Sequence, residues 1–163
     1  MGCGLMQQLT ILNSKEIKQL RNQIELQFGY FFPEDYAYLR TEKEKIFLIN
    51  KDLAKVDWKK LIVDKVGLYL GEDLGPEFRL SKEGAQLLGL AAKKHKVELK
   101  NVVELSKEEL KHYFTGVDLP KDCGEKSRLV LLSYQKDILG CAKYKEGKIL
   151  NFLPKIHRGE VIL

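Results

Sequence analysis

The stretch "RLVLLSYQKDILGCAKYKEGKIL" (residues 128–150) predicts three short strands separated by two tight turns. Its apolar segments, residues 128–134, 138–144 and 148–153, have the length of strands, and "QKD" and "KEG" between them have the polar and glycine residues typical of turns. Because very short connections join antiparallel neighbours, we expect a three-stranded meander at the end of the fold.

Two helices are predicted before this meander. The first follows Ser81, whose hydroxyl can accept a hydrogen bond from the first helical turn. The second begins at Ser106, and Glu109 three positions later completes a capping box. Gly116 can end that helix because glycine adopts a left-handed conformation without strain. Extended segments are expected at residues 78–81 and 97–105.

The N-terminal part also begins with a helix signal. Asn13 or Ser14 can cap the helix, and Gly29 can end it. Between them apolar residues recur at spacings of three and four, which predicts one buried stripe. These residues are Ile17, Leu20, Ile24 and Phe28.

A hairpin, a short helix and a further strand are expected next. They cover residues 36–40 with 45–50, then 51–58, and then 60–71, where Gly71 would end the strand. With the elements that follow, they indicate an α+β fold. We expect a small N-terminal α/β domain over residues 1–66 and a second, β-rich domain over residues 67–163, with no disordered linker between them.

The charge of the chain is uneven along its length. The 163 residues include 44% hydrophobic and 31% charged side chains, which is typical of a globular domain, and the net charge is +5. Residues 121–163 have 9 basic and 5 acidic side chains, a net charge of +4. Most of the positive charge therefore belongs to the last quarter of the chain, which favours an anionic partner there.

The sequence lacks the short motifs of common enzyme sites. It has no GxxxxGK[ST] or GxGxxG loop for phosphate groups and no GxSxG nucleophile motif. Cys3, Cys123 and Cys141 form no CxxC pair, and the three histidines add no metal-binding spacing. No apolar run has the length of a membrane helix. We therefore expect a cytoplasmic protein with reduced thiols, no catalytic residue, no cofactor, no metal and no membrane contact.

The basic residues near the end of the chain are candidates for binding RNA. Alternation places Lys143 and Lys145 on one face of a strand, and Lys148 lies across a tight turn from them. Phosphate contacts are expected from Lys143, Lys145, Lys148, Lys155 and Arg158, and base or sugar contacts from Asn151 and His157. A ring such as Phe152 or Tyr144 could add a base contact. The same pattern also fits a solvated edge strand that lysines protect from aggregation.

The order of the motifs resembles a known family. "VGLYLGE", "FRLSKEGAQLLGLA", "HYFTGVDLP" and "LVLLSYQKDILGCAKYKEGKILNFLPKIHR" follow one another between residues 66 and 158. In this order they are similar to the C-terminal RNA-binding region of the Sun-type RNA 5-methylcytosine methyltransferases, which contains a PUA-like domain. The most specific part is the end, from the last turn to Pro154, Lys155 and Arg158.

This resemblance implies a PUA-like β-barrel that binds structured RNA, either ribosomal or transfer RNA, in RNA modification or ribosome biogenesis. It adds Gly116 as a point where an RNA backbone can approach closely, and Arg79 as a weaker candidate. The sequence has no counterpart of the catalytic domain, so Cys123 and Cys141 inherit no catalytic role. We expect a monomeric, non-catalytic RNA-binding protein, with an RNA methyltransferase acting in trans as a further partner.

Two other hypotheses stay open. The chain could be an adaptor that binds a methyltransferase or an assembly factor, which would need an exposed apolar patch such as "YFFPEDY" (residues 30–36). It could also be a diverged enzyme, which would need a deep pocket with clustered titratable groups.

Overall fold

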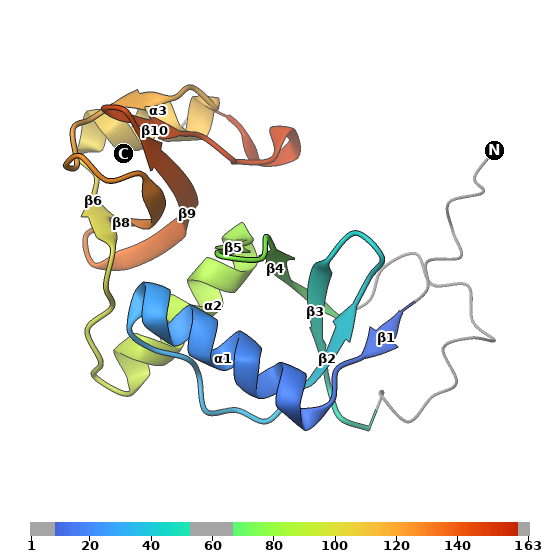
Figure 1. Cartoon of the computed structure of the whole chain (residues 1–163). Helices are drawn as coiled ribbons and strands as arrows, with labels where there is room; N and C mark the ends of the chain where they lie inside the picture. The colour runs from blue at the N-terminus through green and yellow to red at the C-terminus, as the bar shows by residue number, and fades with distance from the viewer. Residues whose placement is uncertain (1–8, 53–66, 160–163) are drawn as a thin grey trace, which may run out of the picture.

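The computed structural model describes residues 9–52 and 67–159, which form three α-helices and two five-stranded sheets (Figure 1). One sheet is curled into a half-barrel, so the predicted α+β fold with a PUA-like barrel is confirmed. The helices are α1 (Ser14–Phe28), α2 (Lys82–Lys94) and α3 (Lys107–Thr115).

The first sheet is antiparallel throughout and has the order β1-β2-β3-β4-β5. Its strands are Thr10–Ile11, Ala37–Arg40, Lys45–Ile49, Leu68–Asp73 and Phe78–Leu80. The predicted hairpin is therefore confirmed as β2 and β3. The predicted helix at residues 51–58 and the first part of the strand at 60–71 lie outside the described residues, and β4 continues past Gly71 to Asp73.

The second sheet has the order β6-β8-β9-β10-β7. Its strands in chain order are Val102–Glu104, Leu119–Pro120, Arg128–Tyr134, Asp137–Lys145 and Lys148–Leu150. Strands β8, β9 and β10 form the predicted meander, and both of its turns place residues in the left-handed region that two-residue hairpin loops require. Strand β6 pairs with β8 in parallel.

The helix ends follow the capping signals of the sequence. Asn13 and Glu16 form a capping box at the start of α1, and Ser106 and Glu109 form another at the start of α3. These bonds satisfy N–H groups that the first turn leaves without partners. At the other end of α3, Gly116 has φ +88°, the left-handed conformation expected of a glycine cap.

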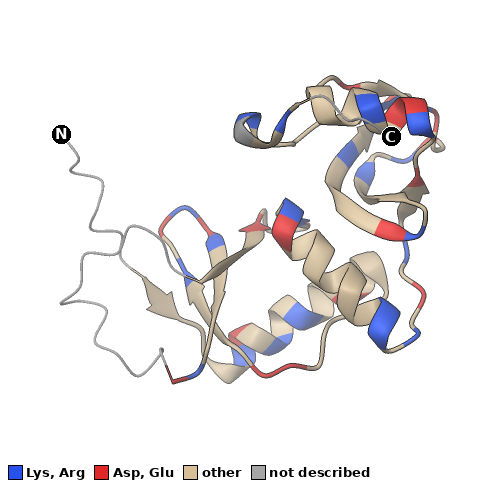
Figure 2. Ribbon diagram, turned by 180° about the vertical axis from the view of Figure 1, so that it is seen from behind, with Lys and Arg blue, Asp and Glu red and all other residues tan. Residues whose placement is uncertain are grey.

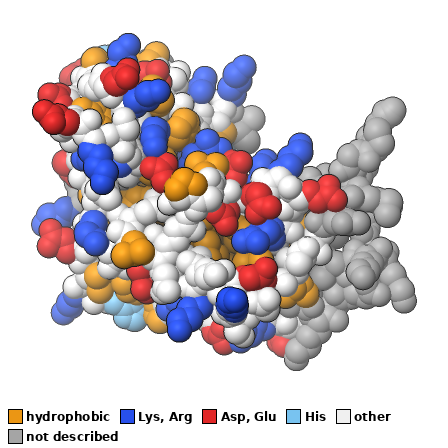
Figure 3. All heavy atoms as spheres, in the orientation of Figure 1, with side chains coloured by type: hydrophobic (Ala, Val, Ile, Leu, Met, Phe, Trp, Pro, Cys, Tyr) orange, Lys and Arg blue, Asp and Glu red, His pale blue; other side chains and the backbone are white. Residues whose placement is uncertain are grey.

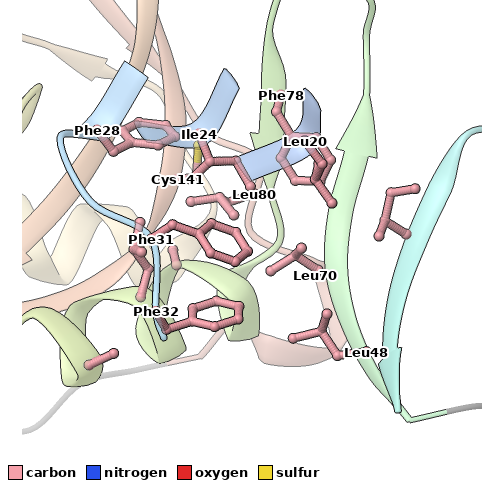
Figure 4. Packing of buried hydrophobic residues seen from close by; sticks show 14 of the residues in the cluster. Leu20, Ile24, Phe28, Phe31, Phe32, Leu48, Leu70, Phe78, Leu80 and Cys141 are labelled. Atoms are coloured by element: carbon pink, nitrogen blue, oxygen red, sulfur yellow. The ribbon is translucent and has the colours of Figure 1, made fainter. Parts of the chain in front are cut away.

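The core joins both sheets. Side chains of α1 and of the first sheet pack against Leu131 of β8 and Cys141 of β9 (Figure 4). A second cluster, under α3, contains Val130 and Leu132 of β8. Because neighbouring residues of a strand point to opposite faces, β8 is buried on both sides and connects the two clusters.

Two sequence predictions need correction. The strand expected at residues 97–105 is limited to Val102–Glu104, because the preceding residues bind the end of α1. The N–H of Lys100 donates to the carbonyl of Phe28 (2.7 Å), and Asn101 is left-handed with φ +56°. The last strand ends at Leu150, three residues earlier than predicted.

The segment at residues 30–36 does not present the apolar patch that an adaptor would need. Phe31 and Phe32 lie in the core with 3% and 1% of their surface exposed. Their rings pack at 4.2 Å between centroids, and Figure 4 shows them between helices α1 and α2, beside the strands of the first sheet.

The division into domains at residues 66 and 67 stays a prediction. Strands β4 and β5 follow that position in the chain and complete the first sheet. Within residues 9–52 and 67–159, no helix is long and apolar enough to cross a membrane.

Candidate RNA interface

The C-terminal segment, defined here as residues 151–159, connects the two halves of the molecule. It leaves β10, passes over β5, forms a 3₁₀ turn at Lys155–His157 and returns to α3 (Figure 1). The N–H of Gly159 donates to the carbonyl of Phe114 at 2.8 Å, which holds the end of the segment against α3.

Asn151 anchors the start of this segment. Its side-chain amide donates to the carbonyls of Tyr113 and Val117 at 2.8 and 2.9 Å, and its Oδ1 accepts from the N–H of Leu153 at 2.8 Å. These bonds explain why β10 ends at Leu150, since the chain turns here to bind α3. They occupy the side chain that the sequence predicts for base or sugar contact.

Gly116 and Arg158, both predicted to contact RNA, lie against each other. A Cβ atom on Gly116 would lie 2.4 Å from Cδ and Nε of Arg158, so only glycine leaves room for this side chain. The Nε atom of Arg158 donates to the carbonyl of Leu153 at 3.1 Å. The guanidinium is therefore held over the end of α3, and Arg158 as a whole is exposed.

Lys145 and Lys148 form an exposed pair at the turn between β9 and β10. Their Cα atoms are directly opposite in the ladder. Lys148 and Asn151 are three residues apart, roughly 10 Å along an extended strand. Asn151 binds the carbonyl of Val117, the neighbour of Gly116, so the contact between Gly116 and Arg158 lies at the opposite end of β10 from the lysine pair. Among the described residues, no carboxylate forms an ion pair with Lys145, Lys148 or the exposed Lys155.

Lys143 differs from its neighbours on β9. Its Nζ lies 2.8 and 3.0 Å from the two carboxylate oxygens of Glu77, in the loop before β5, and only 25% of the side chain is exposed. The pair connects the second sheet to the first and neutralises the charge of Lys143. The geometry of this ion pair suits a structural role, in which it stabilises the packing of the two sheets.

Arg79 has internal contacts, and His157 has a buried ring nitrogen. The Nη2 atom of Arg79 donates to Oε2 of Glu72 at 2.6 Å, and its guanidinium lies 5.0 Å from the ring centroid of Phe152. The Nδ1 atom of His157 is buried and has no hydrogen-bond partner in the part of the chain that the structure describes. Lys82, next to Arg79 in space and absent from the predicted set, also lies on this side of the molecule.

Cys123 and Cys141 are not suited to nucleophilic chemistry. Burial raises the pKa of the Cys141 thiol to about 12, and burial also raises the pKa of Cys123. A thiol with a raised pKa stays protonated near neutral pH and reacts slowly. Within residues 9–52 and 67–159, no group of three His, Cys, Asp or Glu side chains could hold a metal ion.

The charges on the molecular surface are interspersed. Figure 3 shows basic and acidic side chains alternating over one face of the molecule, without a single continuous basic patch. Figure 2 shows the same mixture along the ribbon from the opposite side. The candidate interface is therefore a set of local basic points along β10 and the C-terminal segment.

The second sheet matches a known family. Residues 100–158, from just before β6 to the end of the 3₁₀ turn, match the family described as the methyltransferase RsmF PUA domain. This range contains β10, Gly116, Arg158 and the exposed lysines described above. The resemblance predicted from the sequence is thereby confirmed.

Similar proteins of known sequence support the same relationship over a longer range. A ribosomal RNA small subunit methyltransferase F of Shewanella sp. (strain ANA-3) is 28% identical over 151 residues, 90% of this chain and 30% of that protein. Its counterpart in Aeromonas hydrophila is 28% identical over 144 residues, 88% of this chain and 28% of the relative. The chain thus spans about 30% of the length of these relatives.

Proposed function

We propose, from the match of residues 100–158 to a PUA domain of the rRNA methyltransferase type, that this chain binds structured RNA and serves ribosomal RNA modification. That match is the observation that carries the proposal. The alternative RNA is transfer RNA. In this proposal the chain binds RNA without catalysing methyl transfer. An RNA methyltransferase acting in trans would perform that reaction.

The arrangement of basic side chains supports this proposal. Lys145 and Lys148 at one end of β10, Lys155 in the 3₁₀ turn and Arg158 over Gly116 are exposed, and they lie within the matched range. Cations without carboxylate partners can neutralise phosphates at low cost, because no internal ion pair has to break. Gly116 leaves room for the side chain of Arg158, which would meet an RNA backbone at the end of α3.

A salt titration tests the proposal. With about four phosphates neutralised, raising salt from about 50 to about 200 mM should weaken binding of a small-subunit rRNA fragment roughly 100-fold. RNA binding without salt dependence, or no RNA binding at all, would contradict the proposed function. Transfer RNA, measured in parallel, separates the two RNA classes.

A double substitution tests the site. Lys145→Glu with Lys148→Glu should weaken binding at every salt concentration, by roughly 10-fold or more, and lower the salt slope by about two. The matched control is Lys15→Glu with Lys18→Glu on α1, which changes the net charge equally at two other exposed lysines. Equal effects of the two pairs would mean that net charge alone matters and that the assigned site is wrong.

A further inference from the structure

A cavity lies between the first sheet and the C-terminal segment. Its volume is about 250 Å³. Arg79 of β5 and Lys82 of α2 line one side, Phe152 and Pro154 of the C-terminal segment line the other, and Tyr113 of α3 lies in its wall. Since about 150 Å³ is enough for a benzene molecule, this space has room for a one-ring or two-ring base.

One wall of the cavity is flat and aromatic. The guanidinium of Arg79 stacks at 5.0 Å from the ring centroid of Phe152, and 38% of Phe152 is exposed. Glu72 binds the Nη2 atom of Arg79, which fixes the plane of the guanidinium and offsets its charge. A fixed planar pair of this kind offers a stacking surface for an unpaired nucleobase.

A different part of the cavity wall is formed by the Tyr113 hydroxyl, a polar group that can still form a hydrogen bond. Tyr113 is 2% exposed, and its hydroxyl makes no hydrogen bond to any residue within 9–52 or 67–159. Its Oη would lie 2.5 Å from a Cβ on Gly140, so the missing side chain of that glycine makes room for the phenol. Among the described residues the buried polar atoms without a partner are Nε of Arg40 and Nδ1 of His157, so the Tyr113 hydroxyl is open to the cavity that it lines. A ligand edge that carries an acceptor could take a hydrogen bond from it there.

The Tyr113 hydroxyl is also in the right protonation state to donate. Burial raises its pKa to about 12, so it keeps its proton at neutral pH. Glu83 in the cavity wall offsets the charge of Lys82, and the exposed Lys155 directly follows Pro154 at the rim. This combination suits a base in the cavity with its phosphate outside.

We propose that this cavity receives one unpaired base of the bound RNA, stacked on the Arg79–Phe152 pair with its edge accepting a hydrogen bond from Tyr113. The proposal rests on the proposed RNA-binding function and names the structural element of RNA that this function would recognise. A base inside a helix could not enter, so the cavity selects RNA with a bulge, loop or end.

The test compares two RNA hairpins, one fully paired and one with a single-nucleotide bulge carrying a fluorescent base analogue. The full chain should bind the bulged hairpin about 10-fold more tightly, because stacking of one base has an effect of this size. The fluorescence of the analogue should fall on binding as it stacks. Equal affinity for both hairpins would overturn the proposal.

Substitutions locate the effect. Phe152→Ala removes the exposed ring and should abolish the preference for the bulged hairpin, while Tyr113→Phe keeps the packing and should reduce it severalfold. The matched control Leu90→Ala removes a side chain on α2 that is 66% exposed and should leave the preference intact. Retained preference in Phe152→Ala would overturn the proposal.

The outcomes separate this proposal from the RNA-binding function itself. Lys145→Glu with Lys148→Glu should weaken both hairpins equally and keep the preference. If neither hairpin binds, the proposed function fails and this proposal fails with it. If both bind equally and Phe152→Ala changes nothing, only the base cavity is wrong. A free nucleoside monophosphate is also tested as a competitor of the labelled hairpin. If it competes as strongly as the unlabelled bulged hairpin, the cavity binds a free nucleotide, and the proposal that it receives a base of the bound RNA is overturned.

Discussion

The basic side chains of the two sheets differ in their partners. In the first sheet, Arg40 of β2 lies between 3.3 and 3.9 Å from three carboxylates, those of Glu16, Glu44 and Asp73. In the second sheet, Lys145 and Lys148 are exposed and have no carboxylate partner among the described residues. Arg40 of the first sheet is thus used internally, whereas Lys145 and Lys148 of the second sheet stay accessible to an anionic partner.

Lys143 shows that a lysine on the second sheet is not always accessible to an anionic partner. It lies two residues from Lys145 on the same strand, yet Glu77 from the first half of the molecule binds it. The difference between an internal cation and an accessible one therefore depends on what the other half of the molecule presents opposite each side chain. The two sheets share a core, and this shared packing places Glu77 next to β9.

The largest expected effect comes from the shared core. Leu131 of β8 is 0% exposed and packs in the cluster that joins both sheets. Leu131→Ala should lower the free energy of unfolding by about 3 kcal/mol, through lost burial and the cavity that remains. Urea denaturation followed by circular dichroism measures this loss.

The form of that transition tests whether the sheets fold together. We expect one cooperative transition at lower urea for the variant, since both sheets lose the same contacts. The control is Leu26→Ala on α1, which is 78% exposed and should change stability by less than about 0.5 kcal/mol. Two separate transitions in the Leu131 variant would contradict the shared core.

The second effect concerns the contact of Gly116 with Arg158. Gly116→Ala forces alanine into φ +88° and places its Cβ 2.4 Å from Arg158, so it should cost about 2 kcal/mol and displace the guanidinium. Thermal unfolding measures the stability, and RNA titration should show weaker binding.

Gly147 provides the matched control for this substitution. It has φ +78° in the turn between β9 and β10, and a Cβ there would meet no atom within 4 Å. Gly147→Ala should therefore show the backbone strain alone, about 1 kcal/mol. Equal losses for the two glycines would mean that the Arg158 contact adds nothing to the effect at Gly116.

The smallest effect compares Lys143 with Lys145 directly. Lys143→Gln should lower stability by about 0.5 to 1 kcal/mol, because it leaves the partly buried Glu77 without its cation, and should change RNA affinity little. Lys145→Gln should leave stability unchanged and weaken RNA binding by a few-fold. Both are measured by urea denaturation and by RNA titration, and the reverse pattern would refute the distinction between internal and accessible lysines.

Much of the fold could be predicted because its signals are local. The capping boxes at Asn13 and Ser106, the glycine caps and the two tight turns of the meander each depend on residues within a few positions of one another. The prediction of a strand over residues 97–105 was wrong in its first half. Lys100 and Asn101 there bind Phe28 and Gln27 at the end of α1, more than 70 positions away. No local pattern contains that contact.

The candidate site could be predicted only in part. The basic residues near the end of the chain were predicted from their charge, and in the structure Lys145, Lys148, Lys155 and Arg158 are exposed. Asn151 has the polarity of an RNA contact, but its amide is occupied by the carbonyls of Tyr113 and Val117. The sequence shows which side chains can form hydrogen bonds, and it does not show which of them already have partners.

By itself, the sequence determined the helices, the turns and the concentration of positive charge near the C-terminus, since these depend on neighbouring residues. Only the tertiary structure decided which cations are accessible and where a base-sized cavity lies. Glu77 meets Lys143 across 66 positions, Gly116 meets Arg158, and Arg79 meets Phe152. Such contacts arise when the two sheets pack on one core, because packing brings together side chains whose separation along the chain carries no signal.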